Sequence, residues 1–502
     1  MIASKDITKL EATGRSLELI LRQLEFLKNG TAPLNKLEIA TLGNGIVSLS
    51  PSDIKRALDL YNNEDGSKTW SKFVPASGAA SRMFAYLYAY LNAAASPNFD
   101  ADKYKKENSD IAVFLKKFES FPFFASIDAY LKENGNNMAI DTEAYQLAFI
   151  EALIAPEHFG FGQFPKGLLP FFPGDHQTTS TAFEAQLAES IDLFPKNTPI
   201  DVHFTISKEH RSLFENKEAA FRKQLAPEID HLLTVNYSYQ NYLTDTPVLD
   251  ENDQWLQDAV GDLMFRKGGH GALLDNLNQL EADKFWVKNI DNVQMGKDNE
   301  DGLYWQKILG GYLTLIQNQL FAHLKALEED DNPDIPAIIA FINTYFNKEY
   351  TVENSENKPI QQKLIDYMDR PLRICAMIPN EGAAGGGPLW ETSTRGRTLQ
   401  IVEGVELDSE LPENQKLIAA STHFNPVLIA CGITNRKGEK YPLHDFSNHQ
   451  RYMVVHKTLD GKKIKSLEWP GLWNGGMAFW NTVFIEVPGS TFHPVKKLND
   501  LL

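Results

Sequence analysis

The sequence predicts an α/β protein built on a Rossmann-like, doubly wound sheet. Apolar segments that read as strands alternate with charged helical runs, as where residues 200–207 precede the helical stretch at 208–225. A loop of small residues follows the strand-like segment that begins at Lys72, and a helical run follows the loop. From about residue 371 the chain is rich in strand-like segments. Alternation of this kind is typical of a sheet with helices on both faces.

Residues 1–70 are predicted to form a helical N-terminal region. One helix is indicated by apolar residues at helical spacing, namely Leu17, Ile20, Leu21, Leu24 and Leu27. The pair Ser50-Pro51 is a good start for the next helix, because serine caps a helix and proline fits its first turn.

The rest of the chain is predicted to form one interrupted α/β core. Residues 71–300 supply most of this core, with a helical insertion at about 101–155. Residues 301–370 form a second helical insertion, and the strand-rich residues 371–502 complete the core. Further core strands are predicted at 231–240 and 284–293.

Composition limits the possible partners and location. The 502 residues suggest two or three structural units. A net charge of −17 disfavours nucleic-acid binding, because no basic excess exists to displace counterions. No apolar stretch reaches the length of a membrane span, no signal peptide is recognised, and two cysteines make a disulfide framework unlikely. We therefore expect a cytoplasmic protein without nucleic-acid or membrane partners, either a monomer or a small homo-oligomer.

Two short segments read as the halves of a nucleoside-triphosphate cradle. The first, at 73–84, combines Arg82 with a loop of small residues, namely Ala76, Ser77, Gly78, Ala79, Ala80 and Ser81. Small residues let the backbone approach phosphates, free N–H groups and a helix N-terminus favour negative charge, and arginine adds a fork of donors. The second segment presents Lys166 between a proline and a glycine. Taken alone, the loop is more typical of turn and packing chemistry.

Six segments occur in the order found in sugar nucleotidyltransferases of the pyrophosphorylase type. The chain most resembles UDP-N-acetylglucosamine and UDP-glucose pyrophosphorylases in VPASGAASRM (74–83), PKGLLPF (165–171), VNYSYQ (235–240), FRKGGHGALLDNL (265–277), VKNIDN (287–292) and FHPVKKLNDLL (492–502). It also resembles a bacterial family of proteins of this length whose activity is not established. The resemblance implies a GT-A-like nucleotidyltransferase fold with a mixed sheet.

The resemblance also implies a reaction between two anions. A sugar 1-phosphate attacks the α-phosphorus of a nucleoside triphosphate, with UTP expected, and pyrophosphate leaves. Arg82 and the loop amides would hold the leaving phosphates, while Lys166 and Lys496 would neutralise the reacting ones. Asp291 would bind Mg²⁺ through one carboxylate. The base would be read by Gln240, Gly269, His270 and Gly271, and the sugar by Glu403 and Asn425.

Three departures from the family pattern keep alternatives open. Ser77-Gly78 stands where the family has two glycines, Ala80 replaces a glycine, and His270 replaces an asparagine. A side chain at a glycine position narrows the backbone and crowds the phosphate. The alternatives are a pyrophosphorylase for another base, a glycosyltransferase on the same fold, and a non-catalytic protein that binds a nucleotide or nucleotide sugar. Capping, packing and solvated charge remain the structural explanations for Asp291, the glycines and Lys496, respectively.

Overall fold

The computed structural model describes residues 4–30, 34, 36–64, 66–173, 179–351, 359–382, 386–393, 396–407, 411–459 and 462–502. The chain divides into two compact units, which we describe separately. Unit 1 comprises Met1–Phe73, Ser238–Lys288 and Tyr304–Gly489. Unit 2 comprises Val74–Tyr237, Asn289–Leu303 and Ser490–Leu502.

Unit 1 is built around a mixed sheet. Its strands lie in the order β2 (Thr41–Leu42), β3 (Gly45–Val47), β19 (Asn481–Glu486), β12 (Leu372–Pro379), β16 (Leu428–Gly432), β11 (Lys284–Lys288) and the start of β4 (Trp70–Pro75). Parallel pairs such as β12 with β19 occur beside antiparallel pairs such as β11 with β16. The central strands are buried along almost their whole length, which explains their continuous apolar sequences. The predicted α/β class with a mixed sheet is therefore confirmed.

Two smaller antiparallel sheets complete the strands of unit 1. One contains β1 (Leu37–Ile39), β13 (Gly387–Ser393) and β14 (Gly396–Val402). The other has the order β10 (Phe265–Arg266), β9 (Thr246–Asp250), β18 (Lys462–Glu468) and β17 (Met453–Leu459). A short strand, β15 (His423–Phe424), pairs with β12. Trp390 of β13 and Leu399 of β14 join the same hydrophobic core as the central strands.

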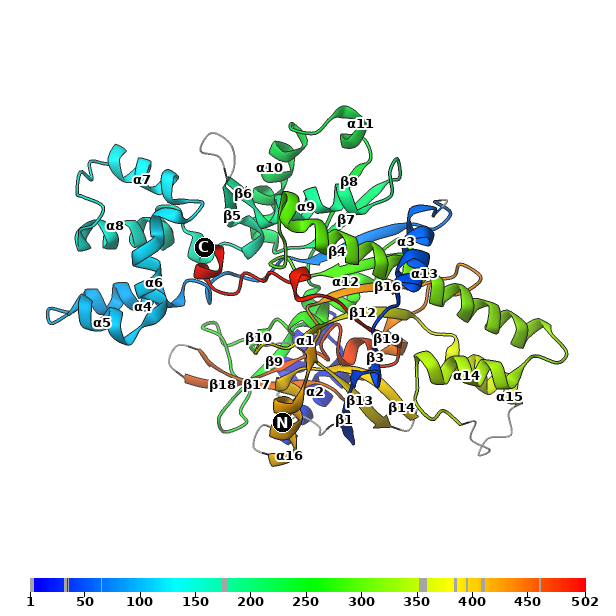
Figure 1. The fold of residues 1–502 in the computed structure, drawn as a ribbon. Coiled ribbons are helices and arrows are strands. Elements are labelled where there is room, and N and C mark those ends of the chain that lie inside the picture. Colours follow the sequence, from blue (N-terminus) through cyan, green and yellow to red (C-terminus); the bar gives the residue numbers. More distant parts are fainter. Residues whose placement is uncertain are drawn as a thin grey trace. The chain divides into compact units, whose positions relative to one another are not determined.

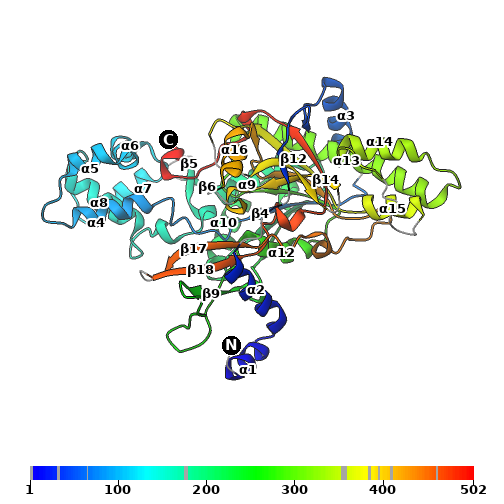
Figure 2. The same cartoon turned by 90° about the horizontal axis from the view of Figure 1, so that it is seen from below.

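The helices of unit 1 include helices at 17–27, from Pro51 and within 301–370, where the sequence predicts them. They are α1 (Ser4–Ala12), α2 (Leu17–Asn29), α3 (Pro51–Asn62), α12 (Leu274–Asn278), most of α13 (Glu300–Glu329), α14 (Ile335–Tyr345), α15 (Ile360–Met368) and α16 (Pro412–Ala420). Ser50 and Asp53 form a reciprocal capping box at the start of α3. Figures 1 and 2 show α14 and α15 side by side. The expectation of a purely helical N-terminal region is wrong at 37–47, where β1 and β3 pair with distant strands and β2 pairs with β3.

Unit 2 contains a helical lobe and a smaller α/β part. The lobe consists of α4 (Ala85–Ala94), α5 (Ala101–Glu107), α6 (Ser109–Lys117), α7 (Phe124–Glu133) and α8 (Glu143–Ile154), drawn in blue and cyan in Figures 1 and 2. Buried aromatic rings, including Phe114, Phe118 and Phe149, fill its interior. The helical insertion predicted at about 101–155 corresponds to α5 to α8.

The α/β part of unit 2 continues from the lobe. It contains the hairpin of β5 (Pro170–Pro173) and β6 (Thr179–Thr181), then α9 (Ala182–Leu193), β7 (Ile200–Thr205), α10 (Arg211–Arg222), α11 (Pro227–Asp230) and β8 (Leu233–Ser238). The strand β7 lies between β8 and the end of β4, and Ala76 donates a backbone hydrogen bond to Thr205. The small-residue loop therefore leaves the sheet directly beside β7. In the part of the chain that the structure describes, no helix is long and apolar enough to span a membrane.

Candidate active site

Three charged residues from distant parts of the sequence converge in unit 2. The ammonium of Lys166 lies 2.8 Å from Oδ2 of Asp291 and 2.8 Å from the carbonyl oxygen of Val495. The ammonium of Lys496 lies 3.1 Å from the same carboxylate oxygen. We call Lys166, Asp291 and Lys496 the lysine–aspartate cluster. Two cations on one carboxylate leave a net positive site, which suits an anionic ligand.

Backbone pairing holds Asp291 and the C-terminal segment together. Val495 donates its N–H to the carbonyl of Asp291, and His493 donates to the side chain of Asn292. Asn292 and Pro494 form an antiparallel bridge. The C-terminal segment thus folds back onto 291–292, as the predicted joint action of Asp291 and Lys496 requires.

Lys166 is positioned by the loop and by a glycine. Its N–H donates to the carbonyl of Gly78, and Ala80 donates to Phe164, so the two predicted cradle segments pair directly. A Cβ added at Gly167 would come within 3.3 Å of the side chains of Phe214 and Ile290. Because Gly167 has no side chain, the 3₁₀ turn Lys166–Leu168 can pack closely against Phe214 and Ile290.

The loop presents several backbone donors. Among the described residues, no protein acceptor faces the N–H groups of Ser77, Gly78, Ala79, Ser81 and Arg82. Arg82 is exposed, and its guanidinium has no partner within the described ranges. Helix α4 begins only at Ala85, without a side-chain cap, so residues 81–84 form a turn instead of the expected helix start. The donors of this site are therefore loop amides rather than a helix N-terminus.

Two alanines of the loop face inward, and one of them, Ala80, is a departure from the family pattern. Ala76 is 0% exposed and Ala80 is 1% exposed, so their methyl groups pack in the interior of unit 2. Ser77 is partly exposed and Gly78 is exposed. A Cβ added at Gly78 would contact nothing within 4 Å. The structure therefore gives no sign that Ala80 crowds the open side of the loop.

Burial and the two lysines act in opposite directions on Asp291. Its side chain is 9% exposed, and burial alone raises the pKa of the carboxyl. The positive charges of Lys166 and Lys496 more than offset this, so that its pKa lies below the ordinary value. Asp291 is therefore ionised in the folded protein at neutral pH.

This electrostatic balance makes Asp291 a pH-dependent contributor to stability. Because the folded pKa lies below its ordinary value of 3.8, the ionised carboxylate stabilises the fold above that value, and the contribution is lost as pH falls through the lowered pKa. Asp291→Asn should destabilise the protein at neutral pH, and its difference from wild type should shrink in acid. Urea unfolding midpoints of both proteins, from neutral pH to about pH 2, measure this. A difference that stays constant over this range would contradict the ion-pair account.

A metal at this site would need ligands beyond the protein. Within the described residues, no group of three or more His, Cys, Asp or Glu side chains could hold a metal ion. Asp291 offers one carboxylate, and its Oδ1 lies 3.4 Å from Lys496. Mg²⁺ is commonly held by one or two carboxylates together with waters and substrate phosphates. The site therefore fits Mg²⁺ that arrives with phosphates, and Asp291 would be its protein ligand.

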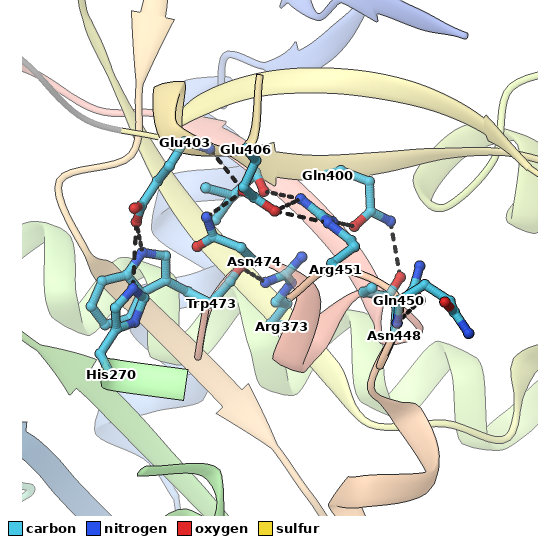
Figure 3. Close-up of polar contacts among 12 residues, drawn as sticks. His270, Arg373, Gln400, Glu403, Glu406, Asn448, Gln450, Arg451, Trp473 and Asn474 are labelled. Carbon is cyan, nitrogen blue, oxygen red and sulfur yellow. Dashed lines mark hydrogen bonds and ion pairs between the residues drawn. The ribbon is translucent and has the colours of Figure 1, made fainter. Parts of the chain in front are cut away.

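A second group of predicted residues meets in unit 1. His270 stacks on Trp473, with ring centroids 4.3 Å apart, and Nε2 of His270 lies 3.8 Å from Oε1 of Glu403 (Figure 3). The indole N–H of Trp473 donates to the same oxygen at 3.1 Å. The backbone N–H of Leu472 donates to Nδ1 of His270, which places the proton of a neutral ring on Nε2. Nδ1 of His270 is therefore bound by the protein, whereas Nε2 lies beyond hydrogen-bond distance of Glu403.

The remaining predicted residues of unit 1 make contacts within the fold. A Cβ added at Gly271 would lie 2.1 Å from the carbonyl oxygen of Pro470, and Gly269 has a φ of +74°. Gln240 donates to the hydroxyl of Thr244. Asn425 is 3% exposed, donates to Ala376 and accepts from Val427. His270 and Glu403 thus come together, whereas the amide of Asn425 is used within the fold.

The buried ionic network beside Glu403 was not predicted from the sequence. Arg451 forms two hydrogen bonds with Glu406, and both side chains are 2% exposed. Asn474 donates to Glu406, and Arg451 also reaches Gln400 (Figure 3). Arg373, a charged residue inside an apolar strand, was the one available signal; it is fully buried and donates to Trp473 and Thr482.

A comparison with family models places the chain. The model described as "Domain of unknown function (DUF4301)" matches residues 3–502. The chain belongs to this family. A search of curated proteins found no significant match to the sequence of this DUF4301 protein.

Several solved pyrophosphorylase structures are similar at low identity. A variant of UDP-glucose pyrophosphorylase from Leishmania major in complex with UDP-glucose has 12% identity and a TM-score of 0.46, covering 100% of this chain and 79% of that chain. The UDP-N-acetylglucosamine pyrophosphorylase from Trypanosoma brucei has 12% identity and a TM-score of 0.45, covering 96% and 74%. A putative UDP-N-acetylglucosamine pyrophosphorylase from Entamoeba histolytica has 12% identity and a TM-score of 0.42, covering 90% and 80%. Membership of the DUF4301 family rests on the family model.

Proposed function

We propose that this protein is a Mg²⁺-dependent nucleotidyltransferase that forms a nucleoside-diphosphate sugar and pyrophosphate from UTP and a sugar 1-phosphate. The observation that carries the proposal is the direct pairing in unit 2 of a donor-rich loop with the segment that presents Lys166, next to Lys496 and Asp291. The order of the six sequence motifs supports the same reaction. In this proposal each of these residues has a role in the transfer reaction.

The reaction forms one P–O bond and breaks another. A phosphate oxygen of the sugar 1-phosphate attacks the α-phosphorus of UTP, and the bridging oxygen between the α- and β-phosphorus leaves with pyrophosphate. The N–H groups of the loop and the guanidinium of Arg82 would bind the leaving phosphates. The ammonium groups of Lys166 and Lys496 would turn from Asp291 to oxygens of the reacting phosphates. Little proton transfer is needed, so positioning and charge neutralisation supply most of the rate.

Asp291 has two successive partners in this proposal. Without ligand it is ion-paired with both lysines. With phosphates bound, the two ammonium groups would move toward the phosphates, and the carboxylate of Asp291 would then hold Mg²⁺, which would supply charge neutralisation there. Glu403 and the edge of His270 are kept as the candidates for base and sugar contacts. His270 and Glu403 are 25% and 27% exposed, so both remain accessible to a ligand.

UTP is expected to stabilise the protein, and more strongly with Mg²⁺. At about 100 times Kd the gain is roughly 2.7 kcal/mol. A thermal-shift series with UTP, GTP, CTP, ATP and dTTP, each with and without Mg²⁺, measures this, and pyrophosphate release with a set of sugar 1-phosphates measures turnover. No response to any triphosphate would refute the proposal. A response without pyrophosphate release from any sugar phosphate would identify a non-catalytic nucleotide-binding protein instead.

A further inference from the structure

Unit 1 contains a cavity of about 240 Å³ that is separate from the residues proposed for the reaction. It lies between the hairpin β13–β14, the end of α15 and the start of β19. Its wall combines aromatic rings, such as those of Tyr367 and Trp480, with amide side chains, such as those of Gln400, Asn448 and Asn481. Apolar walls with a few convergent polar groups are typical of small-molecule sites.

One polar group in this wall has no protein partner. Glu391 of β13 is 6% exposed and lines the cavity. Across the described ranges, no hydrogen bond or ion pair reaches its carboxylate. In the register of the hairpin Glu391 lies opposite Thr398, and Leu389 lies opposite Gln400. Thr398 and Gln400 therefore share a face with Glu391, and all three line the cavity, whereas Trp390 on the opposite face packs in the core.

A second buried glutamate in unit 1 shows what a structural role requires. Glu406 is 4% exposed, and its oxygens bind Arg451 and Asn474. A carboxylate removed from water costs stability unless such partners replace the lost hydration. Glu391 is almost as buried and lacks such partners among the described residues, but its carboxylate oxygens are not fully buried and keep access to the cavity. The missing partners of Glu391 thus point to a ligand.

The charges of the cavity restrict the chemistry of that ligand. Arg370 lines the same cavity, which disfavours a cation, and Glu391 disfavours an anion. Two of the amides are used within the fold, because Gln400 donates to Ala478 and accepts from Arg451 while Asn481 donates to Met368. This leaves the carboxylate of Glu391 as an acceptor in the wall, and hydroxyl groups are suitable donors to it. We propose that the cavity binds a small, neutral, hydroxyl-rich ligand of monosaccharide size, with Glu391 accepting hydrogen bonds from its hydroxyls and the aromatic rings contacting its C–H groups. This site is independent of the proposed nucleotidyl transfer.

The first test needs no ligand. Glu391→Gln removes a buried, unpartnered charge with little change in shape, so it should raise the melting temperature by roughly 1–4 °C. The matched variant Glu406→Gln weakens a satisfied ion pair and should lower it. Differential scanning calorimetry of both variants and of wild type measures these shifts. A lower melting temperature for Glu391→Gln would show a structural role and overturn the proposal.

The second test measures binding by the full-length protein. We expect isothermal titration calorimetry to detect saturable binding of at least one of D-glucose, D-galactose, D-mannose and myo-inositol, and Glu391→Gln should weaken it about tenfold or more, as expected for loss of a charged acceptor. A saturable binding isotherm distinguishes a defined binding site from the general stabilisation that sugars cause because they are excluded from protein surfaces. Glu391→Gln should keep the wild-type thermal response to UTP. No binding of any of the four probes, or binding of ethanolamine in their place, would overturn the proposal.

Discussion

Arg82→Ala is expected to lower kcat/KM for UTP by about 10²–10³-fold while leaving the melting temperature unchanged. The guanidinium is exposed and has no partner among the described residues, so its removal breaks no contact of the fold. Its neighbours in the loop direct free N–H groups to solvent, and an arginine fork adds the charge that these amides lack. Steady-state kinetics with UTP varied, together with thermal melting of the free protein, separates the two effects.

A matched control is available on α3. Arg56 is another exposed arginine, and Arg56→Ala should change neither kinetics nor stability. Lys166→Ala should show the same kinetic loss as Arg82→Ala but should also lower the melting temperature, because Lys166 is the closer partner of the buried Asp291. Wild-type turnover in Arg82→Ala, or an effect of equal size in Arg56→Ala, would remove Arg82 from the proposed site.

The central strands could be predicted because they are buried on both faces. Largely apolar runs such as those of β12 and β16 indicate strands that are buried on both faces. The long helical blocks show apolar residues at helical spacing. The strands β1 to β3 could not be predicted in the same way. Each is only two or three residues long, and β1 and β3 pair with strands that lie hundreds of positions away. The start of α4 was misplaced because no capping side chain marks it.

The candidate site divides along a similar line. Lys166, Asp291 and Lys496 were selected by motif order, since local patterns carry no information about contacts between residues 125 and 205 positions apart. Glu391 was missed because one glutamate in a strand reads as a solvent-facing position, and only the folded hairpin reveals its burial. The Glu406–Arg451 pair was missed for the same reason. The burial of such polar groups depends on tertiary structure and could therefore not be predicted from the sequence.

Asp291→Asn and Lys496→Ala are each expected to reduce transition-state stabilisation by roughly 2–4 kcal/mol. Asp291→Asn keeps the size of the side chain but weakens a metal bond and frees both lysines, so it should also weaken the dependence of turnover on Mg²⁺. Lys496→Ala removes a half-exposed cation from the reacting phosphates and should leave that dependence unchanged. Activity measured across a series of Mg²⁺ concentrations distinguishes the two variants.

The double variant Asp291→Asn, Lys496→Ala tests whether the two residues act on one transition state. Their side chains lie 3.1 Å apart, and residues in contact are not additive, so the double variant should lose less than the sum of the single losses. Lys497→Ala is the matched control, because this adjacent lysine pairs at the surface with Asp110 and should be close to neutral. Additive losses, or a loss in Lys497→Ala as large as that in Lys496→Ala, would show that the C-terminal lysine acts through general charge and not through the cluster that it forms with Asp291.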